Sequence, residues 1–297
     1  MSSIKTVAVY GLGNMGFPIA ERVAQHYAVK VSDLNTEQVK RAENELNAVA
    51  IRTPQDAADV DVVVLSLPSP AISQAVLAAI APHLPKHAIV LETSTVNPDD
   101  MHAAKKLLAP FGLTILDASV LAGVSQMQAG TATLLLGGPE EAVATVQGVL
   151  DAIAKKQIYF GPTGAGAAAK VINNAVAHAV MVVVAEAGSL ATAAGVSCDK
   201  LLGLLSDPQM GLHRPLTYRY AERIMKNDYA GGMPLDAARK DSVLALELAQ
   251  SLGVPLFAIQ GSHSVYEMAA CAGYGRDDYA VIAKLWADWG RPTVPNI

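Results

Sequence analysis

A glycine-rich turn near the N-terminus constrains the fold of this chain more than any other feature. A short apolar run, Val7–Tyr10, leads directly into the turn, and a helical pattern begins at its end. In a G-x-G-x-x-G turn, the first glycine permits a tight turn, the second lets a pyrophosphate approach the backbone, and the third allows close helix–strand packing. Free N–H groups and the helix dipole favour an anion there. The pattern predicts a dinucleotide-binding βαβ unit. Its residues are Gly11, Leu12, Gly13, Asn14, Met15 and Gly16.

An acidic residue follows the turn at the spacing typical of this unit. Asp33 lies 22 residues after Gly11, at the end of a second predicted strand. A carboxylate there accepts hydrogen bonds from a ribose 2′-hydroxyl and repels a 2′-phosphate. The next residues, Leu34 and Asn35, provide no arginine to hold such a phosphate. We therefore predict NAD rather than NADP as the cofactor.

Apolar runs alternate with helical patterns through the first half of the chain, and this alternation then stops. Fully apolar strands joined by helices are typical of a parallel sheet covered on both faces, and right-handed crossovers lead to a doubly wound sheet. Residues 165–194 then form one long Ala-rich helical pattern, with further helical patterns after it. The predicted strands are Thr6–Tyr10, Val29–Asp33, Val60–Leu67, Ala88–Glu92, Leu113–Asp117 and Thr133–Gly137.

The expected fold class is therefore α/β, with two domains. Residues 1–163 form an N-terminal Rossmann domain with a doubly wound sheet. Residues 164–297 form an all-helical domain for substrate binding and oligomerisation, and a long helix joins the two domains. A helix that is apolar on nearly all sides must be buried within a core or between subunits.

Composition excludes several classes of partner. Lysine and arginine number 22 and aspartate and glutamate 27, so the net charge is −5 and the basic excess of a nucleic-acid-binding domain is missing. Hydrophobic residues make up 52% and charged residues only 16%, against roughly 25% charged in an average chain. Because a monomer would expose much of the apolar helix, we predict a homodimer or homotetramer.

The remaining compositional features indicate a cytoplasmic protein that does not enter a membrane. The first residues lack the long apolar stretch of a secretion signal. The most apolar run, Ala175–Ala185, is shorter than the ~20 residues of a membrane span. Two cysteines, Cys198 and Cys271, are too few for a disulfide framework and are expected to be buried thiols. No spacing of histidines and acids predicts a metal site.

The start of the long helix carries a pair of polar residues suited to proton transfer. Lys170 and Asn174 lie four residues apart and therefore share one helical face. Burial would lower the pKa of such a lysine towards values useful for acid–base catalysis. The spacing alone leaves open a lysine that simply reaches solvent. A glycine pair, Gly123 and Gly130, follows the strand that ends at Asp117, and by itself it indicates only a flexible loop.

Four segments together resemble the β-hydroxyacid dehydrogenase family, which includes 3-hydroxyisobutyrate dehydrogenase and tartronate semialdehyde reductase. The resemblance covers nearly the whole chain, and the four motifs stand in the family's order, which is far more specific than any one motif. The segments are the Gly11–Gly16 turn, Asp117–Thr131, Gly164–Asn174 and the pair Lys240-Asp241.

The resemblance implies a role for each segment. Lys170 would be the general acid/base, and Asn174 would help to orient the substrate beside it. Lys240 would close over the nicotinamide end of NAD. The implied reaction moves a hydride between C4 of the nicotinamide and the hydroxyl-bearing carbon of a β-hydroxyacid. Further contacts with the cofactor would come from Leu67, Pro68 and Thr95.

The loop that would hold the substrate departs from the family pattern. The family usually has Asp-Ala-Pro-Val-Ser-Gly-Gly, where this chain has Ser119 for Pro, Leu121 for Ser and Ala122 for the first Gly. Leu121 removes a hydroxyl and adds an isobutyl group, whereas the N–H groups of Ala122 and Gly123 can still bind an anion. We therefore hypothesise a substrate with a larger apolar part or a differently held acid group.

Other functions remain open from the sequence. An imine or ketone reductase on the same scaffold typically replaces the catalytic lysine, and a non-catalytic dinucleotide-binding protein would lose the lysine–asparagine pair. The presence of Lys170 and Asn174 favours the dehydrogenase. His213, Arg214 and Arg219 would suit an anionic substrate, but surface or subunit-interface charges are the alternative.

Overall fold

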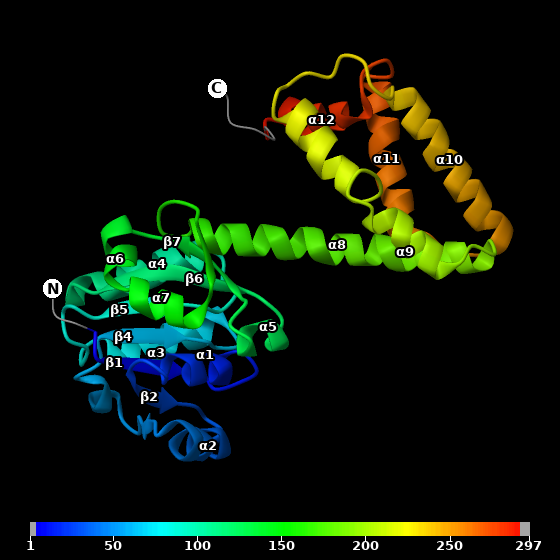
Figure 1. The fold of residues 1–297 in the computed structure, drawn as a ribbon. Coiled ribbons are helices and arrows are strands. Elements are labelled where there is room, and N and C mark those ends of the chain that lie inside the picture. Colours follow the sequence, from blue (N-terminus) through cyan, green and yellow to red (C-terminus); the bar gives the residue numbers. More distant parts are fainter. Residues whose placement is uncertain (1–3, 292–297) are drawn as a thin grey trace. The chain divides into compact units, whose positions relative to one another are not determined.

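The computed structural model describes residues 4–291 (Figure 1). The chain divides into two compact units, Met1–Ala175 and Val176–Ile297, and each has hydrophobic core residues of its own. Strands and helices alternate in the first unit, whereas the second is built from helices. The predicted α/β fold class is confirmed.

An eight-stranded sheet forms the centre of the first unit, in the order β3-β2-β1-β4-β5-β6-β7-β8. All neighbouring strands are parallel except β6 and β7. The chain order reverses between β1 and β4, which is where doubly wound sheets bind ligands beyond the carboxyl ends of their strands. The strands are β1 Thr6–Tyr10, β2 Ala28–Ser32, β3 Val49–Ala50, β4 Val62–Leu65, β5 Ile89–Glu92, β6 Thr114–Leu121, β7 Thr133–Gly137 and β8 Lys156–Tyr159.

Helices cover both faces of this sheet because its strands are apolar on both sides. In β1, Val7 and Val9 belong to one buried cluster, and Ala8 and Tyr10 belong to the other. The first cluster includes residues of α1, α2, α5 and α7, and the second includes residues of α3, α4 and η1. The helices are α1 Gly16–Val23, α2 Thr36–Leu46, η1 Pro54–Ala57, α3 Pro70–Ile80, α4 Pro98–Leu108, η2 Ala109–Phe111, α5 Val124–Gln128, α6 Glu140–Thr145 and α7 Gln147–Ile153.

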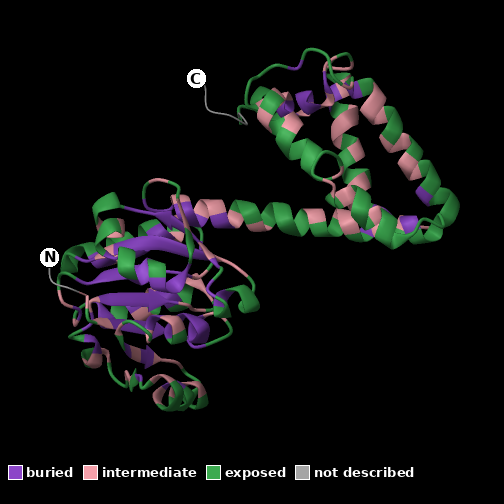
Figure 2. Ribbon diagram, in the orientation of Figure 1, coloured by how far each residue is buried: buried purple, intermediate pink, exposed green. Residues whose placement is uncertain are grey.

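The long helix α8 (Ala165–Ala193) begins in the first unit and continues into the second. It is longer than the apolar run alone indicated, and by length and composition it could cross a bilayer; a core helix of a soluble protein meets the same criteria. Most of α8 is exposed or half-buried within one chain (Figure 2). Of the two predicted alternatives, burial in a core of the same chain is therefore not found for most of α8, and burial between subunits stays a prediction.

The second unit has a small core. Its helices α9 (Cys198–Ser206), the π-helical η3 (Pro215–Ile224), α10 (Leu235–Leu252), α11 (Phe257–Cys271), η4 (Tyr279–Ile282) and α12 (Ala283–Asp288) follow α8. The fully buried Asp278 accepts hydrogen bonds from the N–H groups of Met233 and Ala280, and it pairs with Arg219 at 3.1 Å. Arg219 therefore stabilises this unit. Cys198 and Cys271 are free and exposed, which corrects the expectation of buried thiols.

Candidate active site

A cavity of about 700 Å³ lies at the carboxyl ends of β1, β4 and β5. It lies within the first unit, at the point where the strand order reverses, as expected for a nucleotide site. Predicted site residues that line it are Gly11, Gly13, Asn14, Met15, Asp33, Leu67, Pro68, Thr95, Ala122 and Lys170.

Each glycine of the turn has a distinct steric role. Gly11 has a φ of +91°, and a Cβ there would lie 2.1 Å from the Ser66 carbonyl oxygen. A Cβ on Gly16 would lie 1.9 Å from the Gly11 carbonyl oxygen, so helix α1 can pack this closely only without a side chain. Gly13 has no neighbouring atom within 4 Å of an added Cβ and lines the cavity. The open backbone at Gly13 fits a pyrophosphate.

Asp33 is held rigidly at the cavity wall. Its carboxylate accepts hydrogen bonds from the N–H groups of Leu12 at 2.6 Å and Asn35 at 2.7 Å. The neighbouring Leu34 side chain is fully exposed, and among the described residues that line the cavity, Lys170 is the one cation. The wall around Asp33 therefore provides a carboxylate and no arginine, which suits a ribose with a free 2′-hydroxyl.

Sequence reasoning missed two apolar residues of this site. Ile72 and Val76 of α3 line the cavity together with Leu34 and Leu67. Their spacing of four residues places them on one helical face. Two residues that face a protein core have the same spacing, so the spacing does not indicate a ligand site. The sequence signal for this site was the position of the two residues just after a loop that lines the cavity. These four side chains offer an apolar surface for a flat base.

Lys170 lies on the second turn of α8 and lines the same cavity as the glycine turn. Its side chain makes no hydrogen bond or ion pair with residues 4–291, and the residue is 9% exposed. Burial lowers the pKa of Lys170 from its ordinary value. Of the two alternatives left open by the sequence, the structure has the buried lysine rather than one that reaches solvent.

A buried aspartate that was not predicted fixes the start of α8. Asp117, on β6, accepts hydrogen bonds from the N–H groups of Gly164 and Gly166 at 2.8 Å and of Ala167 at 3.2 Å. Negative charge at a helix N-terminus is favourable because it satisfies N–H groups that have no helical partner. Asp117 thereby fixes the helical turn that precedes Lys170.

The predicted substrate loop begins later than expected, because β6 continues to Leu121 by antiparallel pairing with Thr133 of β7. Ala122 lines the cavity, whereas Leu121 and Gly123 do not. The Gly123 N–H donates to the Gln126 side-chain oxygen at 2.8 Å. One of the two N–H groups expected to hold an acid group is thus engaged within the chain.

Comparison with known proteins places the chain in a family. Residues 6–161 match the family described as the NAD binding domain of 6-phosphogluconate dehydrogenase. Residues 164–286 match the family described as NAD-binding of NADP-dependent 3-hydroxyisobutyrate dehydrogenase. The chain belongs to the β-hydroxyacid dehydrogenase family. It is an NAD-binding oxidoreductase of the 3-hydroxyacid dehydrogenase type.

Individual relatives cover nearly the whole length of this dehydrogenase. An NAD-dependent L-serine dehydrogenase of Pseudomonas aeruginosa is 30% identical, over 95% of this chain and 98% of the relative. The solved structure of a 3-hydroxyisobutyrate dehydrogenase from Mycobacterium tuberculosis with L-serine is 26% identical, with a TM-score of 0.67 over 95% of this chain and 99% of that one. An imine reductase from a Pseudomonas species shares the fold at 23% identity, with a TM-score of 0.83 over 95% and 99% of the two chains.

Four other predicted residues of the dehydrogenase lie outside the cavity lining. Leu12 and Gly16 belong to the glycine turn but do not line the cavity. Asn174 lies one helical turn after Lys170, is half-buried and also does not line it. Lys240 belongs to α10 in the second unit, where it is exposed and lies 3.2 Å from Asp241. The roles of Asn174 and Lys240 therefore rest on the resemblance.

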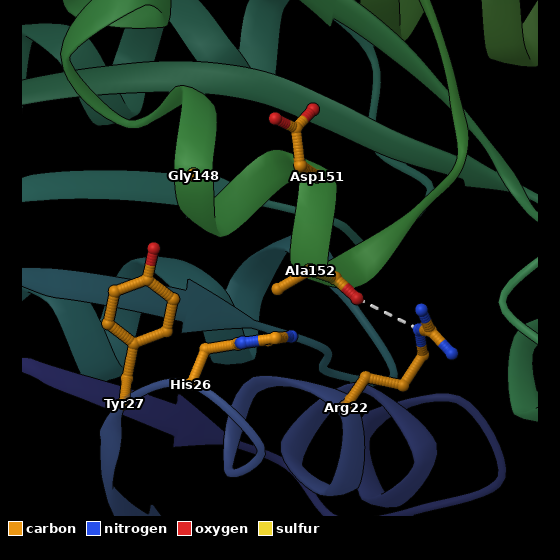
Figure 3. A pocket seen from close by; sticks show the side chains of 6 residues that line it. All are labelled: Arg22, His26, Tyr27, Gly148, Asp151 and Ala152. Carbon is orange, nitrogen blue, oxygen red and sulfur yellow. Dashed lines mark hydrogen bonds between the residues drawn. The ribbon is translucent and has the colours of Figure 1, made fainter.

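A second, smaller hollow of about 290 Å³ lies between the end of α1 and α7 (Figure 3). The Arg22 Nε donates to the carbonyl oxygens of Ala152 at 2.8 Å and Ile153 at 3.2 Å. A Cβ on Gly130 would lie 2.3 Å from the Arg22 guanidinium, so the arginine packs on the end of the substrate loop. Arg22 thus links this loop to α1 and α7.

Proposed function

We propose that the dehydrogenase oxidises the hydroxyl-bearing carbon of a 3-hydroxyacid reversibly, with Lys170 as general acid/base. The observation that carries this proposal is a buried lysine in the same cavity as the glycine turn, which has no hydrogen-bond or ion-pair partner among residues 4–291. Because its pKa is lowered, a larger fraction of the Lys170 amine is uncharged at working pH. A group with a pKa near that pH can both take and return a proton.

Each residue of the site has its own role in the proposed reaction. Bound NAD supplies a nicotinamide that accepts or donates the hydride. During oxidation the neutral Lys170 amine takes the hydroxyl proton as the carbonyl forms, and during reduction its ammonium returns that proton to the carbonyl oxygen. By the family resemblance, Asn174 would help to orient the substrate and Lys240 would act at the nicotinamide end. Asp33 binds the ribose hydroxyls, which favours NAD over NADP.

Replacement of the lysine tests this function. We expect Lys170→Ala to lower kcat by roughly 10²- to 10⁴-fold, the usual contribution of a general acid/base, with NADH affinity largely unchanged. Lys106→Ala, which removes an exposed lysine of α4, is the matched control and should retain full activity. Retained turnover in Lys170→Ala would assign the proton transfer to another group.

The substrate is proposed to carry a larger apolar part than the common small hydroxyacids, or an acid group held elsewhere. Val120 and Ala122 form an apolar cavity wall, and the Gly123 N–H is already bonded to Gln126. A screen of NADH formation over hydroxyacids of graded side-chain size, repeated with NADP, tests both the substrate and the cofactor preference. Efficient turnover of 3-hydroxyisobutyrate or tartronate semialdehyde would contradict this substrate proposal.

We also propose a homodimer or homotetramer located in the cytoplasm, without nucleic-acid or membrane partners. Exposed apolar side chains on α8 support self-association, because such a surface is unfavourable in water. Light scattering should give a mass above 30.9 kDa, and cell fractionation should recover the protein without detergent. The proposed boundary between the two domains lies between residues 163 and 164, just before α8 begins at Ala165.

An imine reductase is the second candidate. The engaged Gly123 N–H favours it, because an imine substrate needs no carboxylate site. The buried Lys170 favours the dehydrogenase instead, because proton transfer from an alcohol needs a base. Reduction of cyclic imines faster than oxidation of any hydroxyacid in the screen would select the second candidate. A non-catalytic dinucleotide-binding protein predicts NADH binding without turnover of either class.

A further inference from the structure

A buried carboxyl group lies directly behind the cavity wall, and no step proposed above uses it. Glu92 is the last residue of β5 and is 2% exposed. The three residues that follow it, Thr93, Ser94 and Thr95, all line the cavity, whereas Glu92 itself does not. The carboxyl group is thus one layer away from any bound cofactor.

Two hydrogen bonds connect Glu92 to both loops that form this wall. The Ser94 N–H donates to the Glu92 carboxylate at 3.0 Å. The Ser94 hydroxyl oxygen in turn accepts a hydrogen bond from the Leu67 N–H at 2.8 Å. Ser94 and Leu67 follow neighbouring parallel strands, β5 and β4. Ser94, which is bonded to this carboxyl group, therefore links the two loops beyond the bonds that Thr93 makes to the Leu65 carbonyl oxygen.

The surroundings of Glu92 make it an unfavourable place for a carboxyl group. Among the described residues it has no ion-pair partner. Burial raises the pKa of Glu92, hydrogen bonding from Ser94 opposes the rise, and the nearby charge of Asp100 adds to it. An apolar side chain would avoid this desolvation penalty. What the carboxyl group adds is a hydrogen-bond acceptor for Ser94.

We propose that Glu92 is a positioning residue for NAD, which acts by holding Ser94 and, through it, the Leu67 backbone at the cavity wall. This proposal rests on the assignment of the cavity to NAD. Loss of the acceptor leaves the Ser94 N–H without its partner, so the link from Ser94 to the Leu67 backbone is no longer held in place. Cofactor affinity should fall, while the proton transfer by Lys170 should be unaffected once NAD is saturating.

The test compares Glu92→Leu, Glu92→Gln and Ser94→Ala by NADH fluorescence titration and by steady-state kinetics. We expect Glu92→Leu to raise the Kd for NADH and the KM for NAD roughly tenfold, with kcat nearly unchanged, as for a lost buried hydrogen bond. Glu92→Gln should bind within about threefold of the wild type, because its amide oxygen still accepts from Ser94. Ser94→Ala should also weaken binding, because the Leu67 N–H loses its acceptor.

Ser73→Ala is the matched control, because Ser73 is a buried neighbour of Glu92 on α3 that does not line the cavity. It should leave the Kd unchanged even if thermal unfolding shifts. A folded Glu92→Leu variant with wild-type Kd overturns the proposal, and so does Glu92→Gln binding as weakly as Glu92→Leu. If Glu92→Leu does not fold, an unchanged Kd in Ser94→Ala overturns it. Wild-type protein that fails to bind NADH would instead refute the cavity assignment on which the proposal rests.

Discussion

The two units differ in how much apolar surface they bury within one chain. In the first unit, two clusters fill both faces of the sheet, and the strand residues Val9, Val64 and Leu91 are completely buried. In the second, the described core has six buried members, from Tyr229 to Leu285. Figure 2 shows the sheet as buried and the helices of the second unit as largely exposed. The first unit buries most of its apolar side chains within itself, whereas the second leaves many of its apolar side chains exposed.

Helix α8 carries part of the surface that remains uncovered. Ile172, Val176, Met181 and Val182 are each about half exposed or more. Large apolar side chains are unfavourable in water, and the proposed self-association would cover those of α8 with a second copy of the chain. The contrast between the units is consistent with the proposed division, in which the sheet provides the cofactor site and the helices provide a surface for self-association.

Charged side chains on α8 should give the strongest test of this difference between the units. Val176→Asp combined with Met181→Asp should weaken self-association by at least about 3 kcal/mol, or more than 100-fold in the dissociation constant, because two apolar side chains lose their burial. The mass from light scattering should fall to that of one chain, and helical signal should melt earlier.

The first unit provides a control for this double substitution. Val49→Asp changes an equally exposed valine at the edge of the sheet and should leave the mass unaltered. NADH binding by the isolated double variant should persist, since the cavity lies within the first unit. An unchanged oligomer mass would show that α8 is not the association surface.

The pH dependence of turnover should distinguish the chemistry of the first unit from the association of the second. Burial lowers the pKa of Lys170 below its ordinary 10.5, and oxidation requires the neutral amine. The rate of oxidation should therefore rise about tenfold per pH unit below that pKa and level off above it. Reduction requires the ammonium and should fall over the same range.

The check is a pair of kcat profiles, one in each direction, at saturating NAD or NADH. Each profile reports the pKa of Lys170 in its own enzyme–substrate complex when chemistry limits the rate. The oligomer mass is the control, and it should stay constant over the pH range used. An oxidation rate that shows no rising limb at any pH at which the protein stays folded would contradict a titrating lysine.

Much of the fold was predictable because the central strands are apolar on both faces. All six predicted strands are present, with boundaries within a few residues. The two missed strands lie at the edges of the sheet: β3 has two residues, and β8 (Lys156–Tyr159) is half-exposed and mostly polar. The continuation of β6 to Leu121 was missed because it depends on an antiparallel partner, β7, which an all-parallel sheet does not suggest.

The site was predictable where chemistry needs a particular residue type. Gly11 and Asp33 stand at fixed spacing because a dinucleotide has fixed dimensions. Asp117 accepts a hydrogen bond from the N–H group of Gly164, which is distant in sequence. Glu92 accepts one from the N–H group of Ser94, just after the end of its strand. No local sequence pattern reveals either contact. Ile72 resembles any core residue of a helix. Glycine and charged residues of the cavity left a signal in the sequence, whereas apolar lining residues and residues that position others did not.

The smallest expected effect concerns the loop that closes the first unit's cavity. The Gln126 side-chain oxygen accepts a hydrogen bond from the Gly123 N–H. Gln126→Ala should therefore free this donor for the acid group of a small hydroxyacid. Because one hydrogen bond to a charged group contributes about 1.5–3 kcal/mol at most and the loop loses its own bond, we expect only a few-fold gain in kcat/KM. The measurement is kcat/KM for 3-hydroxyisobutyrate against that for the best large substrate.

Gln128→Ala is the matched control, because Gln128 is an exposed glutamine on the same short helix and makes no bond to Gly123. The gain should appear for the small acid alone, since a substrate held elsewhere gains nothing from the freed N–H. Equal gains for both substrates would indicate a general loosening of the loop. A loss for the small acid would mean that Gln126 assists its binding, and the altered loop would then not explain the substrate preference.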